Sequence, residues 1–210
     1  MRSRTLASVI VVVAVGATVG VYGRMTPAHT APTVPLGLCG TERWSVKTLT
    51  DAAASKVAFA TSKSRTIEKL RHLKPPAILK GSTPRRASER TVYHVTALLM
   101  MMRREDDSDI HLVLADPKLG GSMIAEFPAS SCTVGADAKE RTAMDSARDD
   151  LAAACGGLPG STPRTLTGTA TLTGVGFFDP IHGQAGVAPN GIELHPVLSF
   201  TSANCKRVKA

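Results

Sequence analysis

The chain is predicted to fold as a mainly β domain, a small five-stranded barrel preceded by a short helical arm, and three observations support this. Three strands, one helix and two further strands follow one another at residues 91–102, 110–114, 122–127, 137–154, 165–178 and 192–200. The first strand is apolar on both faces in only one half, as expected where a strand bends into a closed sheet. Gly168, Gly174 and Gly176 supply corners in the fourth strand. This connectivity is that of the OB-fold, and an α+β sandwich of the same elements is the alternative.

Each strand is recognised by its period of two. Alternation places Leu112 and Leu194 in the core and exposes the stripe that contains Thr169 and Thr171. Pro196 cannot donate a ladder hydrogen bond, so the last strand is expected to be at least partly an edge.

Two helices are predicted. Residues 137–154 contain neither Gly nor Pro, and Gly156 and Gly157 follow as a stop. Residues 64–73 have Ser64 as a candidate N-cap, and two prolines end the segment. A short helical turn is expected near residues 51–57.

The N-terminus resembles a targeting segment. Arg2 and Arg4 precede an uncharged apolar run at residues 6–22. Its length lies between that of a signal core and that of a membrane span, so residues 1–23 are predicted to be either a cleaved signal peptide or a retained anchor. Repeated prolines make residues 24–38 a linker.

Cysteine usage agrees with a secreted or extracytoplasmic protein. The four cysteines lie beyond residue 23, and none of them forms a close C-x-x-C pair. Two disulfides are therefore expected, and no thiolate metal site. The favoured pairing is Cys132–Cys155 with Cys39–Cys205, and the alternatives join Cys39 to Cys132 or to Cys155.

The net charge of +8 is unevenly distributed. Residues 32–87 carry 11 Lys and Arg against 3 Asp and Glu, whereas residues 88–210 carry 11 against 14. Residues 39–87 are interpreted as a basic arm before a barrel domain at 88–205. The arm either keeps the protein soluble or attracts an anionic envelope polymer or another envelope protein. Trp44 and Phe59 are its only Trp, Tyr or Phe side chains, which argues against nucleic acid as the partner.

Several stretches resemble a family of exported bacterial proteins to which no activity is assigned. The resemblance covers most of the chain beyond the linker, and its clearest stretches are residues 39–50, 92–116, 123–127 and 174–198. It supports the domain boundaries and implies no chemistry.

Candidate ligand-binding residues lie in two loops that OB topology places at one barrel mouth. They are Arg103, Glu105, Asp107, Asp109, His111, Asp179, His182, Gln184 and Asn190. Acidic oxygens in such a site could begin to bind Ca²⁺, and no other cofactor is expected. The alternative is that the acidic loop is a solvated turn and that the histidines are held by structural partners.

The sequence favours a non-enzymatic, exported or envelope-associated binding domain. No nucleophile elbow, zinc-protease motif or phosphate-binding glycine loop is present. A secreted metal-dependent phosphodiester hydrolase is the enzymatic alternative, and a structural accessory role is the third.

Overall fold

The computed structural model describes residues 39–77, 79–81 and 83–208. The predicted signal peptide or anchor and the linker at 24–38 lie outside these residues. Among the helices of the described residues, none is both long and apolar enough to cross a membrane.

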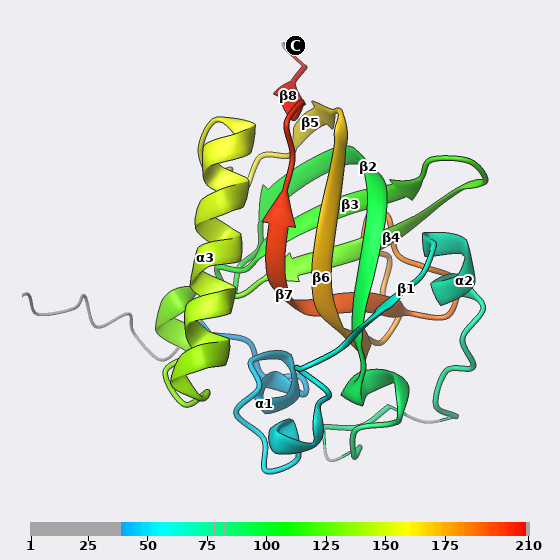
Figure 1. Cartoon of the computed structure of the whole chain (residues 1–210), viewed down its shortest axis with the longest axis vertical. Helices are drawn as coiled ribbons and strands as arrows, with labels where there is room; N and C mark the ends of the chain where they lie inside the picture. The colour runs from blue at the N-terminus through cyan, green and yellow to red at the C-terminus, as the bar shows by residue number, and fades with distance from the viewer. Residues whose placement is uncertain (1–38, 78, 82, 209–210) are drawn as a thin grey trace, which may run out of the picture. The chain divides into compact units, whose positions relative to one another are not determined.

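Five strands close into the predicted barrel (Figure 1). They are β2 (Val92–Arg104), β3 (Ile110–Asp116), β4 (Gly120–Phe127), β6 (Thr169–Phe178) and β7 (Ile192–Thr201). Helix α3 (Ala138–Cys155) follows β4. The pairing runs β2–β3–β4–β7–β6 and returns to β2, with β4 and β7 parallel. The OB-like barrel is therefore confirmed, because the β2–β3 pairing closes a sheet that a sandwich would leave open.

The first barrel strand bends as its sequence predicts. Tyr93, Val95, Ala97 and Leu99 alternate as buried residues, and a register shift between Leu99 and Met101 then places Met102 in the core instead. Residues 92–98 of β2 pair with β6, and residues 98–104, which include the shift, pair with β3. The bulge therefore lets one long strand serve two sides of the barrel.

The predicted fourth strand is divided at Gly168 into β5 (Arg164–Thr167) and β6. Gly168 has a φ of 109°, and a Cβ there would collide with the carbonyl oxygen of Asn204, so only glycine fits. Leu112 and Leu194 are fully buried and Thr169 is exposed, as predicted. Thr171 is half-buried rather than exposed, because it is paired with Thr96 on one side and Thr201 on the other.

Strand β7 is partly an edge, as Pro196 predicts. Its pairing with β4 covers only Glu193 and Leu194, and beyond them β7 is paired with β6 alone. Pro196 itself lies within a register shift of the β6–β7 ladder, where its missing N–H costs no hydrogen bond.

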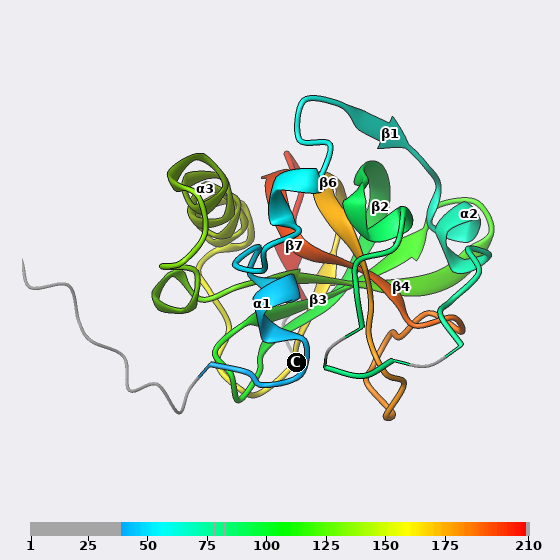
Figure 2. The same ribbon diagram turned by 90° about the horizontal axis from the view of Figure 1, so that it is seen from below.

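The described residues between 39 and 87 (39–77, 79–81 and 83–87) pack against the barrel (Figure 2). They form α1 (Trp44–Lys47), the 3-10 turn η2 (Ala54–Lys56), β1 (Ser62–Ser64) and α2 (Ile67–Arg71). The predicted helix at 64–73 is too long at both ends. Ser64 belongs to β1, which pairs with β2, and the N-cap is Thr66, whose side chain accepts a hydrogen bond from Lys69 N.

The remaining elements are short. They are η3 (Ser88–Arg90), η4 (Ser130–Cys132) and β8 (Lys206–Arg207). Strand β8 pairs with β5 after the chain leaves the barrel.

The predicted disulfide pairing is wrong. Cys39 pairs with Cys132 and Cys155 pairs with Cys205, with Cα–Cα distances of 5.8 and 5.2 Å. Helix α3 is 18 residues long and unbroken, so it spans about 27 Å and separates Cys132, before its start, from Cys155 at its end. Each end of α3 is instead linked to a different terminal segment of the described chain.

Candidate functional site

Two rows of side chains on the outer face of the barrel form the floor of the candidate site. Arg103, His111 and Glu126 lie opposite one another across β2, β3 and β4. In the next row, Ile124 of β4 lies opposite Glu193 of β7. The neighbours of His111, Ile124, Glu126 and Glu193 along β3, β4 and β7 are core residues, so these side chains point away from the interior. OB-folds bind their ligands on this face, around the second and third strands.

Two loops and α1 surround this floor and leave a cavity of about 270 Å³, which we call the barrel-mouth pocket. Its lining brings together eight of the nine residues that the sequence singled out. They are Arg103, Glu105, Asp107, Asp109, His111, Asp179, His182 and Gln184. The loops carrying Asp107 and His182 thus adjoin, as OB topology predicts.

Asn190 is not among the residues that line the pocket. Its Nδ2 donates hydrogen bonds to the carbonyl oxygens of Leu70 and Leu73, and its Oδ1 accepts one from Ile192 N. Asn190 therefore holds the end of α2 against the start of β7.

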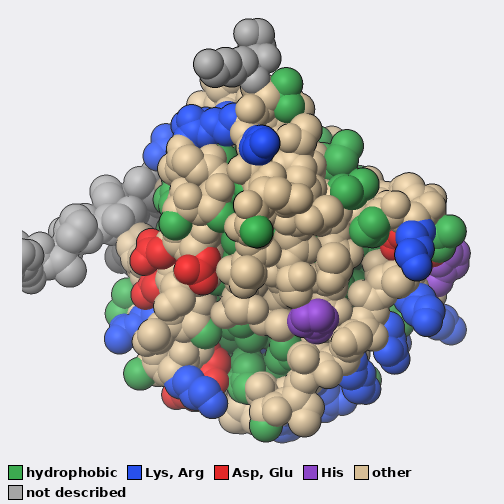
Figure 3. Space-filling view, turned by 45° about the horizontal axis from the view of Figure 1, so that its top comes forward, with side chains coloured by type: hydrophobic (Ala, Val, Ile, Leu, Met, Phe, Trp, Pro, Cys, Tyr) green, Lys and Arg blue, Asp and Glu red, His purple; other side chains and the backbone are tan. Residues whose placement is uncertain are grey.

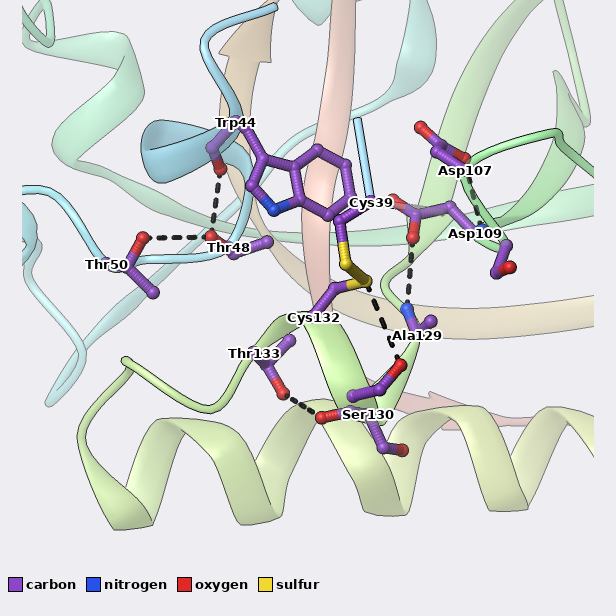
Figure 4. The surroundings of a disulfide bond; sticks show 12 residues. Cys39, Trp44, Thr48, Thr50, Asp107, Asp109, Ala129, Ser130, Cys132 and Thr133 are labelled. Atoms are coloured by element: carbon purple, nitrogen blue, oxygen red, sulfur yellow. Dashed lines mark hydrogen bonds between the residues drawn. A yellow bond between two sulfur atoms is a disulfide. The ribbon is translucent and has the colours of Figure 1, made fainter. Parts of the chain in front are cut away.

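The acidic loop between β2 and β3 is fixed by its own backbone and by a neighbouring loop (Figure 4). Asp107 Oδ1 accepts a hydrogen bond from Asp109 N, and Asp109 Oδ1 accepts one from Ala129 N. Burial, reinforced by the charge of Asp109, raises the pKa of Asp107. Because each aspartate already uses one oxygen on the backbone, the two offer fewer free oxygens than a Ca²⁺ site needs.

The loop between β6 and β7 is also held by its own side chains. Gln184 donates to Asp179 Oδ2 and to the Pro180 carbonyl, and its Oε1 accepts from His182 N. The His182 ring is 62% exposed and lies 3.6 Å from Asp179 Oδ2. Gln184 therefore shapes the loop, and His182 lies at the rim.

His111 is buried beneath this loop between two carboxylates. Its Nε2 lies 2.9 Å from the Ala185 carbonyl oxygen, so Nε2 carries a proton. Its Nδ1 lies 2.7 Å from Glu126 Oε1 and 3.2 Å from Glu105 Oε1. Burial lowers the pKa of His111, but its hydrogen bond to Glu126 and the charge of Glu126 outweigh burial and raise the pKa to about 9. Burial raises the pKa of Glu126 against the opposing effect of His111.

His195 lies between a second pair of buried carboxylates. Its Nδ1 lies 3.0 Å from Glu193 Oε1, and its Nε2 lies 3.4 Å from Asp109 Oδ2. Burial lowers the pKa of His195, but Asp109 and Glu193 outweigh burial and raise the pKa to about 9. The Phe177 ring packs edge-on against the imidazole.

Lys47 of α1 closes one side of the pocket. Its ammonium group lies 3.1 Å from Asp179 Oδ1 and over the Phe177 ring. Burial lowers the pKa of Lys47, but Glu193 and Asp179 outweigh burial and raise it overall. Lys47 is therefore charged and balances part of the acidic lining.

Five charged or titratable lining residues were not among the candidates from the sequence. They are Lys47, Asp106, Glu126, Glu193 and His195. For Glu126, Glu193 and His195, the sequence signal was the alternation of charged or imidazole side chains with core residues in β4 and β7. Such alternation ordinarily indicates a solvated face, and here the loops cover that face.

One set of described residues has the arrangement of metal ligands. Potential ligand atoms of Glu105, His111 and Glu126 all lie within 4.8 Å of one another. The set is one imidazole and two carboxylates, rather than the all-oxygen set that Ca²⁺ prefers.

Comparison with known proteins gives no assignment: no family model, curated protein or solved structure matches the chain.

Proposed function

We propose that this chain is an exported binding domain of the OB type and that its ligand is a cation held in the barrel-mouth pocket. The charge of the lining carries the proposal. Seven carboxylates face the pocket, against Lys47, Arg103 and three histidines. The lining remains net negative even when His111 and His195 both carry a proton. A concave surface of one sign attracts ligands of the other.

An unpaired buried oxygen supports the same function. Glu126 Oε2 is buried without a hydrogen-bond partner among the described residues, whereas Asp109 Oδ2 lies 3.4 Å from His195 Nε2. A buried carboxylate oxygen without a partner is costly, and a bound cation would remove that cost.

Action outside the cytoplasm is supported by the covalent structure. The two disulfides are typical of proteins that fold in an oxidising compartment.

Binding is supported better than catalysis. A general base must be free of its proton near the working pH, yet His111 and His195 are both held by carboxylates that raise the pKa. For the alternative phosphodiester hydrolase, an arginine should be free to hold phosphate. Arg103 lines the pocket, but its Nε and Nη2 both contact Glu105 Oε1.

The test is equilibrium binding to the disulfide-bonded protein of three cations, spermidine, Ca²⁺ and Zn²⁺, and of inorganic phosphate. At least one cation should bind in a salt-sensitive manner and more tightly than phosphate. Replacing Asp106 and Asp107 by Asn should weaken binding several-fold, whereas the matched pair Asp149→Asn and Asp150→Asn on α3 should not. Absence of cation binding, or preference for phosphate, would overturn the proposal. Turnover of bis-p-nitrophenyl phosphate that is lost in Glu105→Gln would establish the hydrolase instead.

We also infer that a basic groove beside α2 contacts an anionic polymer of the cell envelope. Ser64, Arg65, Thr66, Lys69, His94 and Thr96 line this groove, whose volume is about 350 Å³. Figure 3 shows Lys and Arg side chains gathered on the right of the molecule, the side on which α2 lies in Figure 1. Cations flanked by hydroxyl groups are suited to an anionic chain.

A further inference from the structure

The buried floor of the barrel-mouth pocket holds Glu105, His111 and Glu126 as a compact group. His111 and Glu126 are direct cross-strand partners on β3 and β4, and Glu105 comes from the loop that precedes β3. Two of the three are therefore positioned by a rigid sheet, which suits a site that requires defined geometry.

The hydrogen bond to Ala185 fixes the orientation of His111. Because Nε2 donates to that carbonyl, Nδ1 is the nitrogen that faces the two carboxylates. Histidines that bind metals commonly donate their second N–H to a backbone carbonyl in this way, which sets both the tautomer and the ring plane.

A second, independent observation points to a missing partner. Glu126 is only 8% exposed, it lines the pocket, and its Oε2 is buried without a hydrogen-bond partner among the residues that the structure describes. His111 engages Oε1 and leaves Oε2 unsatisfied. A cation bound by the Glu126 carboxylate would offset the cost of this unpaired oxygen, whether Oε1 alone or both oxygens coordinate it.

We propose that Glu105, His111 and Glu126 bind one divalent cation of the zinc class. This deepens the proposed function, on which it rests, by naming the cation and its ligands. Imidazole nitrogen with carboxylate oxygen suits Zn²⁺, whereas Ca²⁺ takes six to eight oxygens. Three protein ligands leave a fourth position open toward the pocket for water or a further ligand.

The present distances are close to those that such an ion requires. With metal–ligand bonds of about 2.0–2.1 Å in tetrahedral geometry, neighbouring ligand atoms lie about 3.3 Å apart. His111 Nδ1 and Glu105 Oε1 are 3.2 Å apart, and Nδ1 and Glu126 Oε1 are 2.7 Å apart. Binding therefore replaces the proton on Nδ1 and widens one contact by about half an ångström.

The experiment is calorimetric titration of the metal-free, untagged, disulfide-bonded protein with Zn²⁺. One ion should bind per chain, and more tightly than Ca²⁺. Glu105→Gln and Glu126→Gln should each weaken Zn²⁺ binding at least about ten-fold. The matched control Glu140→Gln on α3 should leave the affinity unchanged.

A second readout does not depend on how well the variants fold. In the unaltered protein, Zn²⁺ should shift the ring Nδ1 resonance of His111 in ¹⁵N-labelled samples. A shift at His182 in place of His111, or full affinity in both Gln variants, would overturn Glu105, His111 and Glu126 as the ligands while leaving a cation-binding pocket. If spermidine or Ca²⁺ binds but Zn²⁺ does not, the assignment of the cation to the zinc class would be wrong, and the proposed cation-binding function would stand. Failure of all three cations would overturn this inference and the proposed function together.

Discussion

The side chains of the barrel strands make very unequal contributions to the stability of the fold, according to the face on which they lie. Leu112 is fully buried in the main core, whereas Thr169 is exposed at the start of β6. Leu112→Ala should lower the free energy of unfolding by about 2–5 kcal/mol because it leaves a cavity. Thr169→Ala should lower it by less than about 1 kcal/mol. Urea unfolding of both variants measures the difference, and equal losses would contradict the assignment of the faces.

The buried histidines should make stability depend on pH. The pKa of His195 is raised from 6.5 to about 9 in the folded protein, because Asp109 and Glu193 outweigh burial and the opposing charge of Lys47. A raised folded-state pKa contributes stability that is fully present below pH 6.5 and is lost as the pH rises through about 9. The free energy of unfolding should therefore fall between pH 6.5 and 9, with His111 contributing in the same direction.

Urea unfolding across this pH range measures the effect, and His195→Gln is the informative variant. It should retain only the part of the slope that His111 supplies. Equal stability of the unaltered protein at pH 6 and pH 9 would contradict the prediction, and so would an unchanged slope in the variant.

At this same scale, the sequence predicted the rim of the pocket better than its floor. Loop residues such as Asp107 and His182 stand out because acidic and imidazole groups cluster between strands. Glu126, Glu193 and His195 instead occupy alternate positions of strands, which ordinarily indicate exposure to solvent. Only the folded loops reveal that these positions are covered, and loop conformation depends on distant contacts such as that between His111 and Ala185.

At the scale of elements, the length of α3 determines the disulfide connectivity. Non-reducing peptide mapping should recover one peptide pair joining Cys39 to Cys132 and another joining Cys155 to Cys205. Replacing either pair by Ala should cost about 2–5 kcal/mol of unfolding free energy, because each bridge closes a long loop in the unfolded chain. A peptide joining Cys132 to Cys155 would contradict this connectivity and would require α3 to be broken.

Long periodic elements were predicted well, and short ones were not. The strands and α3 follow from patterns sustained over many residues. The segment at 39–87 has no such pattern, and its elements form through contacts with the barrel. Ser64 illustrates this, because its pairing with β2 overrides the capping role that its neighbours suggest.

At the scale of the whole molecule, basic and acidic groups are separated. Arg43 and Arg85 are buried in ion pairs with Glu89 and Asp51, so these two arginines are not available to a partner. Exposed cations such as Lys69 remain on the surface beside α2. The positive potential of the chain therefore belongs partly to this surface, and the carboxylates of the barrel-mouth pocket give that region the opposite sign.

Binding to a polyanion tests whether this surface is an interaction site. The disulfide-bonded protein should be retained on immobilised heparin, used as a soluble-polyanion probe, and should elute earlier as salt screens the contact. The double variant Arg65→Gln with Lys69→Gln should elute at clearly lower salt because both cations line the basic groove. Lys139→Gln with Lys206→Gln removes the same charge from exposed positions outside the groove and should shift elution much less. Equal shifts in the two double variants would show that net charge alone governs retention, and the basic groove would then lose its role as a specific contact for an anionic envelope polymer.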